Sequence, residues 1–266
     1  MNPRRSFHHV RDFQSRSLDR SDTSPRATSL ASARRTSGPG HRRRYVRRVL
    51  AASTPSRLET GADVRFMGPS SPVAVVCVNG GQASEVPGTW SASIEWLVAR
   101  LAQRFTDVRF VEVRYRVKSW KRLDWCVEDA RAAIDAAGAE RVLLVGFSMG
   151  GAVSVRAAPH PAVAGVLGLA PWLPDQLDLR PLEGRRLDVV HGALDRWLPG
   201  IPGVSPSISR RGFERARALG VDGTYTLIPG ALHGIALRGR GGRLVPLPRA
   251  GRWIELAAIR VAHVRG

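Results

Sequence analysis

Ser148 stands in the pentapeptide Gly-Phe-Ser-Met-Gly, directly after the apolar run 142–145. A serine on a sharp turn exposes its hydroxyl, and a neighbouring base can activate that hydroxyl as a nucleophile toward an acyl carbon. Gly146 and Gly150 remove the side chains that would collide across such a turn. The alternative interpretation is a turn serine that caps the following helix.

The chain from residue 61 onward alternates strand-length apolar runs with segments of helical periodicity. This alternation predicts an α/β fold with a mainly parallel, doubly wound sheet and flanking helices. Binding sites in such sheets lie at the carboxyl ends of the strands. The predicted strands cover residues 64–67, 73–78, 108–113, 142–147, 163–169, 187–190 and 225–228, and the clearest helical patterns cover 90–105 and 123–137.

The elements around Ser148 favour the nucleophile. The predicted strand ends at residue 147 and the predicted helix 149–158 begins at once, so the turn forces Ser148 into strained backbone angles. The start of the helix directs free N–H groups at the site, and the N–H of Met149 is available to a developing oxyanion. Gly151 is expected to let this helix pack close to the sheet.

This strand, Gly-x-Ser-x-Gly turn and helix resemble the nucleophile elbow of the α/β-hydrolase fold superfamily. The resemblance covers about residues 60–266 and points to a serine hydrolase of the dienelactone-hydrolase-like or small esterase type. It implies a catalytic triad in the chain order serine, acid, histidine. The reaction is then attack on an ester or amide carbonyl through an acyl-enzyme intermediate.

The resemblance also implies where the acid and the histidine lie. Asp195 follows the run 187–190 in a strand-end loop, and His233 follows the run 225–228 in another. Asp188 competes as the acid, but it lies inside the predicted strand. In this interpretation the histidine takes the serine proton, and the aspartate fixes the imidazole tautomer.

The second donor of the oxyanion hole is expected from the loop that follows residues 73–78. This loop reads Asn79-Gly80-Gly81-Gln82, with asparagine where relatives often have histidine. Backbone donors do not depend on that side chain, so the hole consists of the N–H of Met149 with that of Gly81 or Gln82.

Three other histidines are alternative candidates for the base. His191 lies near the same edge, but we expect it to pack beside the acid loop, and His160 and His263 lie in unfavourable positions. The sequence contains no metal-ligand cluster, no phosphate-cradling loop and no dinucleotide fingerprint. We therefore expect no metal and no cofactor.

The segment 170–186 between the sixth and seventh strands of the fold has room for little more than a loop. We expect a short or absent lid and an open site for a small-molecule acyl substrate. Trp172 and Tyr115 are the candidates for the substrate pocket, although packing explains Trp172 equally well. A thioesterase, a peptidase and an acyltransferase use the same triad and stay open, as does a catalytically inactive scaffold with an arginine-rich binding arm.

Residues 1–58 differ in composition from the remainder, which we expect to be the hydrolase domain, 59–266. They hold 14 arginines against Asp12, Asp19 and Asp22. Such a segment buries too little apolar surface to offset its ordering entropy, so we expect a disordered arm with one short helix over 42–52. Export through the twin arginines is disfavoured because no apolar stretch follows. Non-specific binding to nucleic acid or anionic lipid, a solvated tail and a start-site extension stay open.

The whole chain of 266 residues carries 41 Lys and Arg against 22 Asp and Glu. Arginine in place of lysine, with abundant alanine and glycine, is typical of a GC-rich bacterial genome and weakens net charge as a functional signal. Cys77 and Cys126 sit in apolar patterns typical of buried free thiols. No apolar stretch is long enough to span a membrane. We expect a cytoplasmic protein without a specific nucleic-acid partner, and the oligomeric state stays open.

Overall fold

The structure is a computed structural model that describes residues 54–196 and 203–266. The helix expected over 42–52 and most of the predicted arm lie outside the described residues. A two-residue strand, β1 (Ser56–Arg57), pairs antiparallel with β2 (Asp63–Met67) just before the predicted domain boundary at residue 58. The sheet therefore begins a few residues earlier than the apolar pattern indicates.

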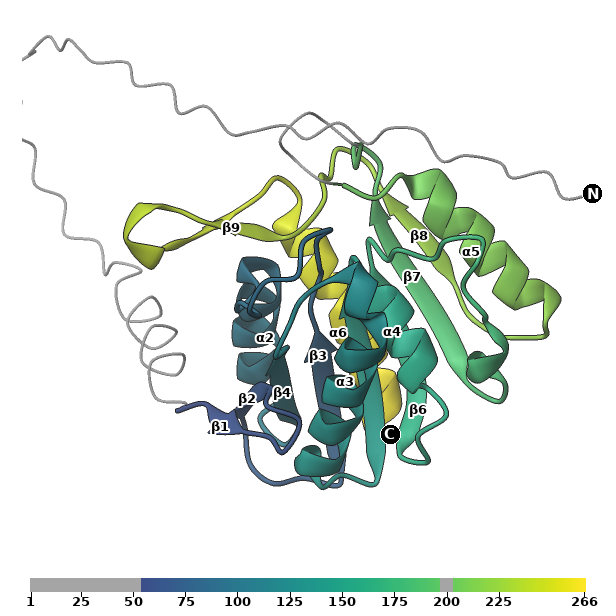
Figure 1. The fold of residues 1–266 in the computed structure, drawn as a ribbon. Coiled ribbons are helices and arrows are strands. Elements are labelled where there is room, and N and C mark those ends of the chain that lie inside the picture. The colour runs from purple at the N-terminus through teal and green to yellow at the C-terminus, as the bar shows by residue number, and fades with distance from the viewer. Residues whose placement is uncertain (1–53, 197–202) are drawn as a thin grey trace, which may run out of the picture. The chain divides into compact units, whose positions relative to one another are not determined.

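Eight strands form one sheet in the order β1-β2-β4-β3-β5-β6-β7-β8 (Figure 1). The strands β4, β3, β5, β6, β7 and β8 are all parallel, whereas β2 pairs antiparallel with both of its neighbours, β1 and β4. This is the mainly parallel doubly wound sheet that the sequence predicts. The remaining strands are β3 (Val73–Val78), β4 (Arg109–Arg114), β5 (Arg141–Phe147), β6 (Val163–Leu169), β7 (Arg186–Gly192) and β8 (Tyr225–Ile228).

Helices cover both faces of this sheet. On one face lie α3 (Leu123–Ala137), α4 (Gly150–Ala157) and α5 (Pro206–Ala218), and on the other lie α2 (Ala92–Arg104) and α6 (Ala250–Arg265). Three short 3-10 helices, η1 (Trp120–Arg122), η2 (Arg180–Leu182) and η3 (Arg240–Gly242), lie in the connections.

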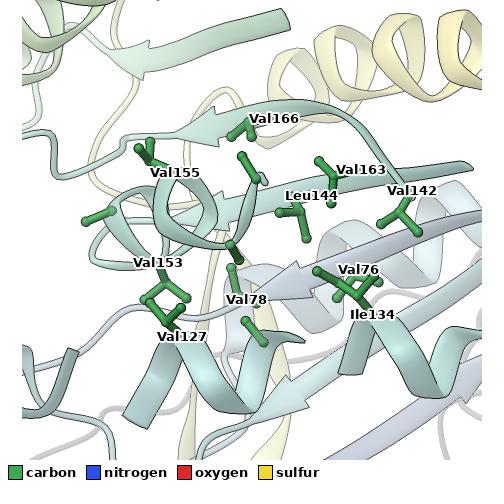
Figure 2. Packing of buried hydrophobic residues seen from close by; sticks show 14 of the residues in the cluster. Val76, Val78, Val127, Ile134, Val142, Leu144, Val153, Val155, Val163 and Val166 are labelled. Carbon is green, nitrogen blue, oxygen red and sulfur yellow. The ribbon is translucent and has the colours of Figure 1, made fainter. Parts of the chain in front are cut away.

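The core consists of two apolar layers, one on each face of the sheet. Val76 and Val78 of β3 pack with α3 and α4, as Figure 2 shows, whereas Val75 and Cys77 pack with α2 and α6. Alternate residues of a strand point to opposite faces, and a strand that is covered on both faces is apolar throughout. This double burial explains why the central strands read as continuous apolar runs.

Sequence periodicity missed two elements. The helix α5 is rich in arginine and buries only Ser209, Gly212 and Ala216, so it shows no apolar stripe. The hairpin of β9 (Ala236–Arg238) and β10 (Leu244–Pro246) has strands too short to show alternation.

The connection between β6 and β7 contains only the short helix η2, as the short-lid prediction requires. The carboxyl ends of the central strands are thus not covered by an inserted helical lid. Across residues 54–196 and 203–266, none of the helices is long and apolar enough to cross a membrane.

Candidate active site

The turn after β5 holds Ser148 in a left-handed backbone conformation, with φ of 55°. Such a conformation costs a non-glycine residue on the order of 1–3 kcal/mol, and it persists because the surrounding structure enforces it. The backbone N–H of Ser148 donates to the carbonyl of Leu169 at 3.0 Å, which ties the turn to β6. The helix α4 begins two residues later, at Gly150. The predicted strain at Ser148 is therefore present.

Two glycines permit this turn because backbone atoms approach them closely. A side chain at Gly146 would overlap the carbonyl oxygen of Gly150, and one at Gly150 would place its Cβ 2.5 Å from the oxygen of Val78. Gly151 has a different neighbour from the one expected. A Cβ there would overlap Pro171, so this glycine admits the loop after β6 rather than the sheet itself.

Gly146→Ala is expected to destabilise the fold by about 2 kcal/mol or more, because the added methyl group meets backbone that cannot yield. Urea unfolding, followed by circular dichroism, measures this loss. Gly251→Ala in α6 is the matched control, because a Cβ there has no atom within 4 Å. This control should be neutral or slightly stabilising, since alanine favours helix. Equal losses in the two variants would contradict the steric account.

The loop after β3 lies directly against the serine turn. A Cβ built on Gly80 would lie 3.2 Å from the Cβ of Ser148 and 3.6 Å from its Oγ, and one on Gly81 would overlap the side chain of Met149. In the part of the chain that the structure describes, the backbone N–H of Met149 donates to no protein acceptor. Gln82 is paired with Ser119 in an isolated bridge.

Asn79 holds this loop in place. Its side-chain amide donates to the carbonyl of Val113 at 2.6 Å and to that of Thr89 at 3.4 Å. The backbone carbonyl of Asn79 accepts a hydrogen bond from the hydroxyl of Tyr115 at 3.1 Å. Asn79 thus anchors the loop to the end of β4.

Asp195 and His233 meet at the carboxyl ends of β7 and β8. The Nδ1 atom of His233 lies 2.6 Å from Oδ2 of Asp195. A carboxylate only accepts hydrogen bonds, so Nδ1 carries the proton and Nε2 keeps its lone pair. The carboxylate is 1% exposed, and its Oδ1 accepts the backbone N–H of Val204 at 3.2 Å.

The ring of His233 packs against Phe147, with ring centroids 5.0 Å apart. Phe147 immediately precedes Ser148, so the histidine loop and the serine turn share the same edge of the sheet. No hydrogen bond joins Ser148 to His233 in this structure. Apo geometry of this kind is common, since catalytic hydrogen bonds often tighten only when substrate binds.

The competing carboxylate, Asp188, interacts with other residues than His233. Asp188 forms ion pairs with Arg186 at 2.9 Å and Arg260 at 3.3 Å, and it accepts the hydroxyl of Thr224 at 2.7 Å. It therefore stabilises the sheet and α6, and it has no contact with His233. This distribution agrees with the choice of Asp195 over Asp188.

Sequence reasoning placed His191 beside the acid loop, but it missed a direct contact. The Nε2 atom of His191 lies 2.9 Å from Oδ2 of Asp195, so two imidazoles reach one carboxylate oxygen. Burial by itself would raise the pKa of Asp195, but the hydrogen bonds from His191 and His233 outweigh it and hold the pKa below its ordinary value. The four-residue spacing from His191 to Asp195 is the only signal of this contact in the sequence.

The two candidate pocket residues have different environments. Trp172 donates its backbone N–H to the carbonyl of Ser148 at 2.8 Å, and its ring lies 6.2 Å from that of Trp120, between centroids. Trp120 is 44% exposed. Tyr115, by contrast, is 2% exposed, and its hydroxyl donates to the backbone of Asn79. Its ring is therefore not accessible to a substrate.

No group of three or more histidine, cysteine, aspartate or glutamate side chains within 54–196 and 203–266 is arranged to hold a metal ion. Cys77 and Cys126 are buried free thiols, as the sequence indicates.

The chain matches the Alpha/beta hydrolase family over residues 75–264. It belongs to that family, and it is a hydrolase. Among curated proteins, no sequence matches this chain.

Solved structures with the same fold include XC6422 from Xanthomonas campestris, an α/β serine hydrolase without a lid. It is 17% identical, with a TM-score of 0.54, over 79% of this chain and 92% of that one. YeeB, a sugar hydrolase from Lactococcus lactis, is 18% identical, with a TM-score of 0.59, over 79% and 97%. A monoacylglycerol lipase from Paleococcus ferrophilus is 15% identical, with a TM-score of 0.53, over 75% and 98%. At these identities the likeness extends to the fold alone.

Proposed function

We propose that this protein is a serine hydrolase that cleaves an ester or a related acyl bond of a small molecule. Ser148 is the nucleophile, His233 the general base and Asp195 the acid of the triad. The observation that carries the proposal is the 2.6 Å hydrogen bond between Asp195 and His233 at the sheet edge that also presents Ser148 with φ of 55°.

The first half of the reaction forms an acyl-enzyme. Nε2 of His233 takes the hydroxyl proton as Oγ of Ser148 bonds to the carbonyl carbon. The carbonyl oxygen becomes an oxyanion, and the N–H of Met149 stabilises it together with a donor from the loop after β3. The second donor is the N–H of Gly81 or that of Gln82, whose carbonyl accepts the N–H of Trp120 at 3.1 Å. The intermediate collapses when His233 returns the proton to the leaving group.

The second half of the reaction repeats these steps with water. His233 takes a proton from the water, the hydroxide adds to the acyl carbon, and the collapse of the new intermediate returns the proton to Oγ of Ser148. Asp195 stays ionised throughout and stabilises the imidazolium, a role that suits a carboxylate whose pKa is held below its ordinary value.

Apolar aromatic surface beside the serine favours esters of apolar acids over charged substrates. Trp172 donates its backbone N–H to the carbonyl of Ser148, and its ring lies beside that of the exposed Trp120. Two cations that follow β4 are engaged, because Arg116 pairs with Glu128 and the Nζ of Lys118 donates to Thr89 at 2.8 Å. Thioesters, peptides and acyl acceptors other than water use the same steps, so a panel of acyl donors has to separate these activities.

A fluorophosphonate probe tests the nucleophile. It should form one covalent adduct on Ser148, seen by mass spectrometry of the intact protein and its peptides, and Ser148→Ala should abolish the adduct. Ser154→Ala is the matched control, because Ser154 lies in α4, the helix that follows the serine turn, and is fully buried. Its labelling should equal that of the wild type. Labelling that persists in Ser148→Ala overturns the proposal.

Trp172→Ala is expected to raise KM for aryl and medium-chain esters about tenfold, with kcat changed less than threefold, because an aromatic wall binds ground state and transition state alike. Steady-state kinetics with acetate, butyrate and octanoate esters measure the effect, which should grow with chain length. Trp96→Ala on α2 removes an indole that contacts Arg100 and should leave KM unchanged. A change in KM that is equal for all chain lengths would contradict an acyl-binding role.

A further inference from the structure

His191 is a buried histidine that the reaction above does not use. Its side chain is 0% exposed, and its Nε2 lies 2.9 Å both from Oδ2 of Asp195 and from the carbonyl oxygen of Val204. Both of these atoms only accept hydrogen bonds, so Nε2 carries a proton. The ring therefore donates toward Asp195 whatever the charge of His191.

The other side of the ring is also satisfied. Nδ1 of His191 lies 2.7 Å from the hydroxyl of Ser209 in α5, which lies 3.0 Å from the hydroxyl of Tyr225 and 3.1 Å from the carbonyl of Pro206. A neutral His191 accepts the Ser209 hydroxyl at Nδ1 while Tyr225 donates to Pro206 at 3.0 Å. The hydrogen bonds from α5 and β8 thus fix the ring in one orientation.

The oxygen that His191 reaches is the one that His233 uses. Oδ2 of Asp195 accepts Nδ1–H of His233 at 2.6 Å and Nε2–H of His191 at 2.9 Å, while Oδ1 accepts the N–H of Val204 at 3.2 Å. The positive end of the His191 N–H dipole therefore lies beside the charge that would stabilise a protonated His233. Two donors on one oxygen compete for the same electron density.

Within residues 54–196 and 203–266, the charged groups near His191 and Asp195 lie on α5 and on the Asp195 loop. Arg210 of α5 stacks on Tyr225 of β8, with 4.3 Å to the ring centroid, and Glu214 of α5 is exposed. Burial raises the pKa of Tyr225, so its hydroxyl stays neutral near pH 7. Arg196 is exposed next to Asp195. The ring of His233 packs against the apolar ring of Phe147.

We propose that His191 is a positioning residue of the active site. It holds the Asp195 carboxylate toward His233. Its N–H also donates to the carboxylate oxygen that His233 uses, which weakens the electrostatic stabilisation that Asp195 gives to protonated His233. The base then stays available at lower pH than it would beside an unshared carboxylate. The catalytic consequence rests on the proposed function, whereas the sharing of the carboxylate does not.

Proton NMR tests this sharing without any substrate. His191→Phe keeps an aromatic ring but removes the N–H, so the remaining hydrogen bond from His233 to Asp195 should strengthen. Its Nδ1–H resonance should move downfield, and the pH midpoint of the His233 ring titration should rise by roughly half to one unit. His191→Gln keeps an N–H donor at the same reach and should stay near the wild type. His191→Leu replaces His191→Phe if the larger ring prevents folding, as judged by urea unfolding.

The kinetic readout is the acid limb of kcat/KM against pH, which should move upward by the same amount in His191→Phe and not in His191→Gln. An unchanged or lowered midpoint in His191→Phe overturns the proposal, because His191 would then be a support whose loss merely displaces Asp195. Failure of the proposed function has a different signature. Without acyl hydrolysis or probe labelling in the wild type, the NMR shifts alone decide whether the carboxylate is shared.

Discussion

Asp195→Asn is expected to lower kcat about 10⁴-fold while the protein stays folded. Among the residues that the structure describes, three donors face this carboxylate: the N–H of Val204 and the imidazoles of His191 and His233. An asparagine has only one acceptor oxygen, so its NH₂ must face at least one of these donors. If it faces His233, the imidazole is held with its proton on Nε2 and no longer accepts the proton of Ser148.

Asp188→Asn is the control for this prediction. Asp188 is 4% exposed, and it pairs with Arg186 and Arg260. Its loss should reduce the free energy of unfolding but leave kcat within about threefold at 25 °C. Steady-state kinetics on both variants, with circular dichroism to confirm folding, make the comparison. If Asp188→Asn has the larger effect on kcat, the acid is misassigned.

His233→Gln is expected to lower kcat about 10⁵- to 10⁶-fold, since glutamine has no group that takes up the proton of the serine hydroxyl. The residual rate over the uncatalysed reaction should come from substrate binding and the oxyanion hole. Single-turnover measurements with an activated ester are sensitive enough to follow the variant. The rate of fluorophosphonate labelling should fall with kcat, because the probe needs the same activated oxygen.

His160→Gln is the matched control for His233→Gln. Nε2 of His160 also contacts a carboxylate, that of Asp135 at 2.9 Å, but this pair joins α3 to the end of α4 on the exposed surface. The variant should keep its kcat within about twofold, because exposed pairs of this kind contribute little even to stability. A large loss of activity in His160→Gln would show that the histidine at the site has been misidentified.

The order of the elements and the main residues of the site follow from local patterns in the sequence. The strands β3, β6 and β8 have the predicted bounds. For β3 and β6, which lie inside the sheet, the reason is that a strand buried on both faces is apolar throughout. Ser148 lies between glycines at a strand-to-helix junction, and steric exclusion alone demands those glycines. Residues after successive parallel strands share one edge, and the resemblance to the α/β-hydrolase fold implied that Asp195 and His233 follow two such strands.

Only the tertiary structure decided which contacts the remaining residues make. Tyr115 follows a buried strand, as a pocket residue would, but the fold turns its ring inward to hold Asn79. His191 is four residues from Asp195, yet their contact depends on the position of Ser209 in α5, a helix without an apolar stripe. Periodicity reports which face of an element is buried. It carries no information on which polar groups meet across the sequence, because hydrogen bonds depend on ångström-level placement of elements that are far apart in the chain.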